Sequence, residues 1–395
     1  MTNITTPIYF DNAATTFPKP ETVLCRVEDC MRYYCGNAGR GGHVLAMKSA
    51  EVVYETREKL ATLFGASPEN VVFTYNTTYA LNMAIKGIAS KGGHFLISNM
   101  EHNSVLRPIA RLARDRKITY DVFTAYSPSR QLSHKDICSD IMKKLRPDTR
   151  AVICTHASNV CSYSLPIAEI GAFCHRHGLI FIVDAAQSAG HMPIDMRADN
   201  VDVLCMPAHK GLYAPQGLGI MMLGENITLD TLIEGGNGVN SLDLDMGRSH
   251  PERYEGGTLC TPAIAGLCQS LDFISGIGYA QIKAHEQKLW ARAYDQLSGI
   301  SGIKVYAPDH AGSVLLFNLD GINADEIGGE LSRRGFCLRT GYHCAPLAHK
   351  ALGTQDGGAL RMSFGLFNTD SEVDILCKNV REIANDVPIG QKFVK

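Results

Sequence analysis

An aspartate and a lysine follow two successive apolar segments near the middle of the chain. Asp184 comes directly after residues 180–183, and Lys210 comes shortly after residues 203–205. Short apolar segments of this kind are typical of buried parallel strands, whose carboxyl ends meet at one edge of a sheet and carry ligands there. Asp184 taken alone could equally be a helix cap. Lysine, by contrast, is rarely buried without a function.

A lysine and an aspartate facing one crevice are the pair that pyridoxal 5'-phosphate requires. The amine forms a Schiff base, and the carboxylate keeps the pyridine nitrogen protonated so that the ring accepts electrons. A phosphate site is offered by Asn76, Thr77 and Thr78, where a helical segment begins, although the same residue types also cap helices that bind nothing. The chain has no Gly-x-Gly-x-x-Gly motif and no Walker-type lysine loop, which excludes the usual dinucleotide and nucleoside-triphosphate sites.

The elements that position these residues alternate between apolar and helical patterns from about residue 50 to residue 223. This alternation indicates an α/β fold with a mostly parallel seven-stranded sheet and helices on both faces. The expected strands are residues 71–74, 95–98, 118–123, 151–155, 180–183, 203–205 and 220–223. The expected helices, with apolar residues three and four positions apart, are residues 49–64, 78–89, 104–116, 135–144 and 168–177.

The last third of the chain differs in composition and in its apolar pattern. Residues 234–257 are rich in glycine and polar residues, which predicts a long loop, and residues 261–297 have helical periodicity. Strands at 314–319 and 360–364 with helices at 325–334 and 371–385 predict a smaller α+β domain. We therefore divide the chain into a large cofactor-binding domain, residues 17–265, and a small α+β domain formed by residues 1–16 and 266–395.

Composition excludes several classes of function. The 395 residues include 38 Lys plus Arg and 40 Asp plus Glu, without a block of like charge, so neither nucleic acid nor a membrane surface is an expected partner. The apolar run 179–183 is far shorter than the roughly 20 residues of a membrane-spanning helix. The N-terminus lacks a secretory signal, so we expect a cytoplasmic protein. The thirteen cysteines contain no Cys-x-x-Cys pair, and no metal site is expected.

A series of short motifs makes the sequence resemble one family. The motifs are DNAATT (11–16), GNAGR (36–40) with His43, FTYNTT (73–78), EHN (101–103), SNV (158–160), DAAQ (184–187), HK (209–210), GGT (256–258), RTGYHCAP (339–346) and RMSFGLFNT (361–369). In this order they resemble class-V aminotransferases, and in particular cysteine desulfurases of the SufS-like branch. The resemblance runs from about residue 9 to residue 385. It implies the fold-type I architecture of enzymes that depend on pyridoxal 5'-phosphate.

The resemblance also assigns cofactor-binding roles to individual positions. It implies that Lys210 holds the cofactor and removes the Cα proton of the substrate, and that Asp184 pairs with the pyridine nitrogen. His102 would stack on the ring, as a further catalytic residue. The other implied cofactor ligands are Gln187 and Asn159 at the ring hydroxyl, and Asn76, Thr77, Thr78, His209 and, from a second subunit, Thr258 at the phosphate. Such a shared site would make a homodimer obligatory.

The substrate side of the site is implied in the same way. Arg361 would bind the substrate carboxylate, with Asn159 beside it, and the other implied substrate-binding residues are Arg339, His43 and Arg40. Cys344 decides the reaction, because its thiolate would attack the sulfur of L-cysteine, retain it as a persulfide and release L-alanine. A thiolate near neutral pH needs a positive setting, which Arg339 and His343 could provide. The sulfur would then pass to an acceptor protein or thiol, for iron–sulfur cluster assembly or thiolation.

Two departures from the family pattern keep alternatives open. Pro207 stands where many members have a phosphate-binding Ser or Thr, and Tyr342 stands where SufS proteins usually have His. The alternatives are a selenocysteine lyase that needs Cys344 less, another C–S lyase, aminotransferase or epimerase of the same fold, and a catalytically silent binding scaffold. Cys344 could also be one more structural cysteine.

Overall fold

The central sheet of the computed structural model has seven strands. The structure describes residues 7–39, 41–239, 241–307, 309–310 and 312–386. The strands lie in the order β2 (Val71–Thr74), β8 (Gly219–Leu223), β7 (Val203–Pro207), β6 (Ile180–Asp184), β5 (Thr149–Thr155), β3 (His94–Ser98) and β4 (Thr119–Phe123). Only β8 runs antiparallel to its neighbours in this sheet. The expected mostly parallel, seven-stranded sheet is confirmed.

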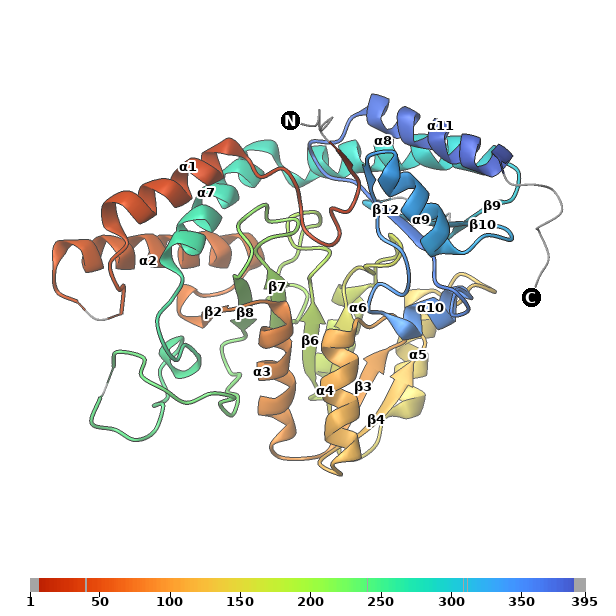
Figure 1. Cartoon of the computed structure of the whole chain (residues 1–395). Helices are drawn as coiled ribbons and strands as arrows, with labels where there is room; N and C mark the ends of the chain where they lie inside the picture. The colour runs from red at the N-terminus through yellow and green to blue at the C-terminus, as the bar shows by residue number, and fades with distance from the viewer. Residues whose placement is uncertain (1–6, 40, 240, 308, 311, 387–395) are drawn as a thin grey trace.

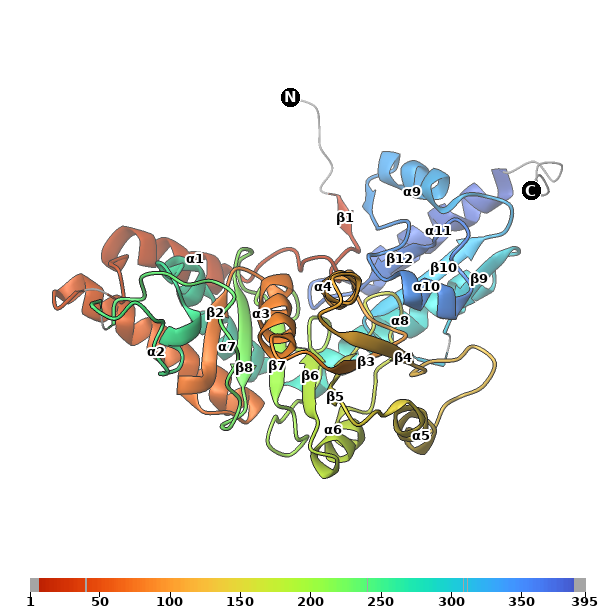
Figure 2. The same cartoon turned by 90° about the horizontal axis from the view of Figure 1, so that it is seen from below.

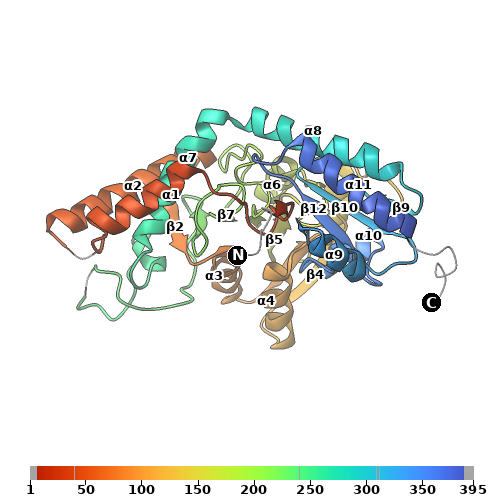
Figure 3. The same cartoon turned by 45° about the horizontal axis from the view of Figure 1, so that its top comes forward.

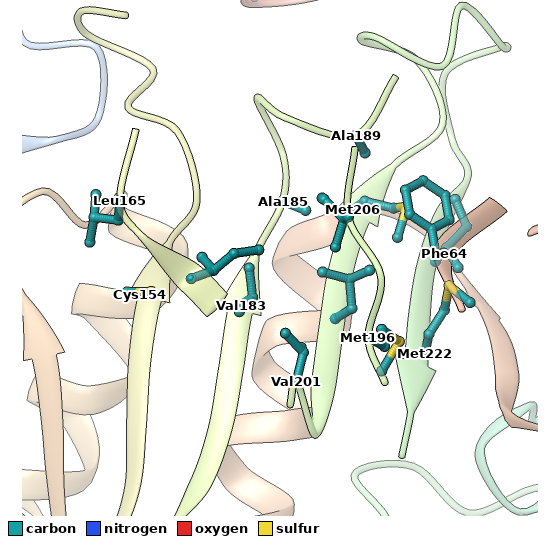
Figure 4. Packing of buried hydrophobic residues seen from close by; sticks show 14 of the residues in the cluster. Phe64, Cys154, Leu165, Val183, Ala185, Ala189, Met196, Val201, Met206 and Met222 are labelled. Carbon is teal, nitrogen blue, oxygen red and sulfur yellow. The ribbon is translucent and has the colours of Figure 1, made fainter. Parts of the chain in front are cut away.

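Helices cover both faces of this sheet (Figures 1 and 2). One face packs against α3 (Thr77–Ala89) and α4 (Asn103–Arg114). The other packs against α2 (Val44–Phe64), α5 (His134–Lys144), α6 (Ile167–Arg176) and α7 (Thr261–Ile277). Strand side chains alternate between the two cores, as the two-residue period requires: Phe181 and Val183 belong to one, and Ile182 to the other. Figure 4 shows Val183 and Met206 in the first of these cores.

A second, smaller unit has its own hydrophobic core. Its antiparallel sheet places β10 (Val314–Leu319) between β9 (Ile303–Tyr306) and β12 (Leu360–Ser363). The helices packed on it are α8 (Tyr279–Ser298), α9 (Ala324–Arg333) and α11 (Asp370–Asp386). The remaining elements are β1 (Ile8–Tyr9), which pairs with β11 (Phe336–Cys337), the helices α1 (Glu21–Asp29) and α10 (Pro346–Leu352), the π-helix η1 (Cys30–Tyr34) and the 3-10 turns η2 (Pro68–Asn70) and η3 (Glu252–Tyr254).

The helical segment expected over residues 261–297 is two helices. The expected helical character is confirmed, and Gly278 separates α7 from α8 with a φ of 86°, which L side chains rarely adopt. The helix expected from residue 49 begins at Val44, where the His43 ring caps it. Helix α1 was not expected at all; it follows Pro20 and exposes most of its surface, so it carries little of the apolar periodicity that marks a helix.

Helix α8 links the two units, and Figure 3 shows it running from α7 to a position beside α11. Its Ile282 packs in the core of the large sheet, whereas Leu289 and Trp290 pack in the core of the small unit together with Phe10. The division at residue 265 stays a prediction; the buried residues change from one core to the other within α8. In the described ranges no helix combines the length and the apolar character that crossing a bilayer requires.

Candidate active site

A cavity of about 110 Å³ opens at the carboxyl end of the central strands. Asp184 is the last residue of β6, and Lys210 follows β7, so both reach this cavity. Of the expected residues, the cavity is also lined by Asn76, Thr77, Thr78, His102, Asn159, Gln187 and His209. These segments therefore meet at the carboxyl edge of the sheet, as the sequence predicted.

Burial shifts the pKa values of Lys210 and Asp184 in opposite directions, because it disfavours the charged form of each. Burial lowers the pKa of Lys210 to about 8; Arg361 and Arg339 lower it too, and Asp184 opposes them. Burial raises the pKa of Asp184, although the carboxylate accepts a 2.9 Å hydrogen bond from the Ala186 amide and faces the Lys210 charge. A lysine that loses its proton near neutral pH is suited to nucleophilic and proton-transfer chemistry.

The N-terminal segment holds the peptide that carries Lys210. The His209 carbonyl accepts hydrogen bonds from Lys19 Nζ at 2.7 Å and from the Thr16 amide at 3.1 Å. The Thr16 hydroxyl lies 3.1 Å from the Lys210 carbonyl. Sequence reasoning included residues 11–16 in the family motif but gave them no role, because these contacts join segments nearly two hundred residues apart.

Two buried polar atoms in the cavity have no hydrogen-bond partner among the described residues. They are Thr77 Oγ1 and His209 Nδ1. They lie beside the first turn of α3, whose amide N–H groups have no acceptor within the helix. Unpaired buried polar atoms at a helix N-terminus fit an anion such as a phosphate.

Two residues expected at the phosphate have other partners. The Asn76 side chain caps α3 by accepting from the Tyr79 amide at 2.9 Å, which is the alternative function that this residue type allowed. The Thr78 hydroxyl lies 2.9 Å from that of Ser104. Both residues still line the cavity, and their role at a phosphate stays a prediction.

His102 is uncharged and held in one orientation. It caps α4, and its Nδ1 accepts from the Ser104 amide at 3.0 Å, with the Ser104 hydroxyl 2.7 Å away. Because Nδ1 accepts, Nε2 carries the ring hydrogen in the neutral form. Burial lowers the pKa of His102 to about 4, assisted by the charge of Lys210 and of nearby arginines. A flat neutral ring lining the cavity fits the stacking role that the family resemblance implies.

Arg361 is buried, with an exposed fraction of 2%, on the edge of the small sheet facing the large one. Its Nη2 pairs with Asp11 Oδ1 at 2.6 Å, and its Nη1 donates to the Asn159 carbonyl at 2.9 Å. Arg361 Nε has no hydrogen-bond partner within the described ranges. Arg339 lies alongside, since its backbone pairs with that of Arg361 in an antiparallel bridge. Two adjacent guanidinium groups suit a carboxylate substrate.

Cys344 is an exposed residue in a loop that is tied to the cavity wall. The Cys344 carbonyl accepts a hydrogen bond from the amide of Asn103, the residue after His102, at 2.7 Å. The carbonyl of the preceding residue, His343, accepts from Asn159 Nδ2 at 2.6 Å. Burial lowers the pKa of His343 to about 2, so this ring is neutral. The expectation that His343 supplies positive charge beside Cys344 is therefore wrong, because the ring points into the protein interior.

Among the described residues, five expected ones do not line the cavity: Arg361, Arg339 and Cys344, whose contacts are given above, and Thr258 and His43. Thr258 lies in another hollow, near Tyr75 and Gly256, and accepts from Asn37 Nδ2 at 3.4 Å. His43 is the cap of α2, and its Nδ1 accepts from the Ala46 amide. Arg40 lies outside the described residues. Their site roles stay predictions.

Gln187 reaches the cavity, but its amide already donates to the Ala13 carbonyl at 2.9 Å. The side-chain oxygen of Gln187 is therefore the atom available to accept a hydrogen bond from a ring hydroxyl.

Glu101, which precedes His102 in the chain, was given no role by the sequence analysis. It is fully buried, and burial raises its pKa to about 8, although it accepts from Ser98 and from the Thr155 amide.

Asp11 and Ser104 are the residues of this site that sequence reasoning missed. Asp11 belongs to a quoted motif, but its partner Arg361 stands 350 residues further along. No local pattern connects two such positions. Ser104 could have been found, because the second residue of a helix that begins after His102 lies within reach of a capping side chain.

Comparisons with known proteins agree with this fold and site. The family model of class-V aminotransferases matches residues 8–376. The chain therefore belongs to the class-V aminotransferase family, whose members depend on pyridoxal 5'-phosphate, and within it to the cysteine desulfurases. The placement within the SufS-like branch stays a prediction.

Individual relatives are similar over nearly their whole length. The chain is 33% identical to a probable cysteine desulfurase of Methanothermobacter thermautotrophicus, covering 95% of this chain and 94% of that one. It is 31% identical to the cysteine desulfurase of Dickeya dadantii, covering 95% and 91%. The apo structure of the cysteine desulfurase from Thermococcus onnurineus NA1 superposes with a TM-score of 0.88 at 29% identity, covering 96% and 95%.

Proposed function

We propose that this protein is a cysteine desulfurase that converts L-cysteine to L-alanine and retains the sulfur on Cys344. The observation that carries the proposal is that Lys210 and Asp184 share one cavity, whose wall residue Asn159 hydrogen-bonds both the Cys344 loop and Arg361. Membership of the cysteine desulfurases supports it.

The residues present fit pyridoxal 5'-phosphate. Thr77 Oγ1 and His209 Nδ1 are buried without hydrogen-bond partners in the part of the chain that the structure describes, as expected of atoms that bind a phosphate. Asp184 would hold the pyridine nitrogen, and Lys210, with a pKa of about 8, would bind the carbonyl carbon. When bound, the cofactor withdraws electrons from the substrate Cα and so makes its C–S bond easier to break. Pro207 offers the phosphate neither a hydroxyl nor an N–H, so Thr77 and His209 carry more of the binding.

The chain's own groups bind and deprotonate the substrate. Arg361 would take the carboxylate of L-cysteine with Arg339 beside it, and the charges of both add to burial in lowering the pKa of Lys210. Lys210 as a free amine can then remove the Cα proton. His102, with its hydrogen on Nε2, can hold or return a proton at the cavity face.

Cys344 carries out the sulfur-transfer step. Its thiolate attacks the substrate sulfur, an S–S bond forms, and the substrate C–S bond breaks with its electron pair passing to carbon, which is protonated to give alanine. The enzyme is left with Cys344 as a persulfide. The thiolate of an acceptor then attacks the outer sulfur, so that an acceptor persulfide forms, the S–S bond to Cys344 breaks and the Cys344 thiolate is released. The acceptor would be a protein or a small thiol, and iron–sulfur cluster assembly or thiolation is the use implied.

We propose a homodimer in which Thr258 completes the partner's phosphate site. Thr258 does not line the Lys210 cavity of its own chain. The surface around it also exposes the large apolar side chains of Tyr75 and Ile233. Sedimentation of wild type and Thr258→Ala, with cofactor retention measured in both, tests this.

The central experiment measures alanine formed from L-cysteine and from L-selenocysteine, with excess thiol, by wild type and by Cys344→Ala. We expect the variant to lose alanine from cysteine and to keep that from selenocysteine, whose carbon–selenium bond breaks more easily. Cys25→Ala, an exposed cysteine on α1, is the matched control and should keep both activities. Alanine from selenocysteine only, in both proteins, would make the protein a selenocysteine lyase. Pyruvate in place of alanine would indicate another C–S lyase.

A further inference from the structure

Three buried side chains form a hydrogen-bonded chain behind the Cys344 loop. His343 Nδ1 lies 3.0 Å from His349 Nε2, and His349 Nδ1 lies 2.7 Å from Thr354 Oγ1. All three residues are buried, and the two rings stack with centroids 5.2 Å apart. Neither His349 nor Thr354 enters the chemistry proposed above.

A backbone carbonyl sets the direction of this chain. His343 Nε2 lies 3.4 Å from the Arg339 carbonyl, which can only accept, so Nε2 carries the hydrogen. His343 Nδ1 must then accept from His349 Nε2, and His349 Nδ1 accepts from the Thr354 hydroxyl. This pattern needs two neutral rings, and burial lowers the pKa of His343 to about 2 and that of His349 to about 4.

The loop that these rings support has an unusual backbone. His343 and Cys344 have φ angles of 48° and 56°, a region that residues other than glycine rarely occupy. Two contacts hold this conformation from the front, through the His343 carbonyl to Asn159 and the Cys344 carbonyl to Asn103. The histidine chain holds it from behind, because the His343 ring is fixed on one side by Arg339 and on the other by His349.

We propose that His349 is a positioning residue that, through His343, holds the Cys344 thiol in the place where it receives sulfur. The inference rests on the proposed function of Cys344. A rotation of the His343 ring turns the peptide that carries Cys344, and two successive left-handed residues relax to other conformations once a support is removed. Because a misplacement of about 1 Å in a reacting group can cost roughly 100-fold in rate, a loose loop slows sulfur transfer without touching substrate binding.

The test uses the cofactor-loaded enzyme and His349→Phe, which keeps a flat aromatic ring for stacking but loses both hydrogen bonds. We expect single-turnover alanine formation from L-cysteine to slow by at least about tenfold, with the half-saturating cysteine concentration unchanged. Alanine from L-selenocysteine should stay within about twofold of wild type, since that reaction depends less on the thiolate. His349→Gln should recover most of the rate, because its amide can donate to His343 and its carbonyl can accept from Thr354.

His94→Phe is the matched control. His94 is buried and bonded to Thr149 at 2.8 Å, but it lies at the amino end of β3, opposite the cavity. It should form alanine at the wild-type rate. Thr354→Val, which removes only the last hydroxyl, provides the same comparison if His349→Phe does not fold, and it too should slow the cysteine reaction alone.

The two proposals fail in different ways. If Cys344→Ala still forms alanine from cysteine, the proposed function is wrong. If Cys344→Ala is inactive on cysteine but His349→Phe and Thr354→Val match wild type, only the positioning role of His349 is overturned. Equal slowing on cysteine and selenocysteine would also overturn it, because a general structural role does not distinguish the two substrates.

Discussion

The ion pair between Asp11 and Arg361 offers a sharp test of how the two parts of the molecule are joined. Asp11 Oδ1 lies 2.6 Å from Arg361 Nη2, and the side-chain exposed fractions are 21% and 2%. Removal of one partner from a buried pair typically costs 3–5 kcal/mol, because the other charge stays buried without compensation. Since water reaches part of Asp11, we expect Asp11→Ala to lower the free energy of unfolding by about 3 kcal/mol, at the low end of that range.

The control is a pair of the same length in a different environment. Glu28 and Arg32 also lie 2.6 Å apart, but their side chains are 59% and 63% exposed. Such a pair contributes only about 0.3–0.5 kcal/mol, so Glu28→Ala should be nearly silent. Asp11→Asn, which keeps an acceptor oxygen but removes the charge, should fall between the two.

The assay is urea unfolding followed by circular dichroism, with equal m-values required before the free energies are compared. The half-saturating cysteine concentration is measured on the same proteins, because Arg361 without Asp11 loses one of its two anchoring contacts and should bind the substrate carboxylate in a less defined orientation. The reasoning is refuted if Asp11→Ala and Glu28→Ala shift stability equally, since burial would then not decide the strength of the pair.

Three further predictions concern the cavity. Because the pKa of Lys210 is lowered to about 8, the unfolded chain binds more protons than the folded chain between pH 8 and 10.5. The cofactor-free wild type should therefore gain stability relative to Lys210→Met as the pH rises over that range. A difference in unfolding free energy that does not change with pH would contradict the lowered pKa. Thr77→Ala removes a hydroxyl that has no partner in the free protein, so thermal unfolding of the cofactor-free form should not suffer, whereas cofactor dissociation should be about 10-fold to 100-fold easier by absorbance after dialysis. Gly358→Ala would place a Cβ 2.7 Å from the backbone of Gly341 at a φ of 71°, so it should displace the Cys344 loop and change the rate at which iodoacetamide alkylates that thiol.

The large sheet could be predicted because its information is local. Each central strand is an apolar run bounded by polar residues, and all seven were expected within a few residues of their observed bounds. Asp184 and Lys210 could be predicted for the same reason, since residues at the carboxyl end of a buried parallel strand lie where ligands bind. Apolar spacing predicted helix over residues 261–297 but could not locate the boundary at Gly278, because that spacing continues across it and only the positive φ separates the two helices.

The rest of the site depends on contacts that no local pattern encodes. Asp11 meets Arg361 across 350 residues, and the neutral state of His343 follows from burial behind a loop whose position the sequence does not reveal. The nearness of His343 to Cys344 in the sequence suggested that it could supply positive charge, but the ring turns inward and pairs with His349. Charge states of this kind become visible only when the surroundings are known.

The two units of the molecule divide the proposed chemistry between them. The groups that fit the cofactor, including Lys210, Asp184 and Thr77, stand on strands and helices of the large sheet. Arg361 stands on the small sheet, and the Cys344 loop extends from the same unit. Perturbations of the small unit should therefore impair substrate binding and sulfur transfer while the cofactor is retained. The contact of the Cys344 carbonyl with the first residue of α4 is where the two sets of groups meet, so a change there should act on sulfur transfer first.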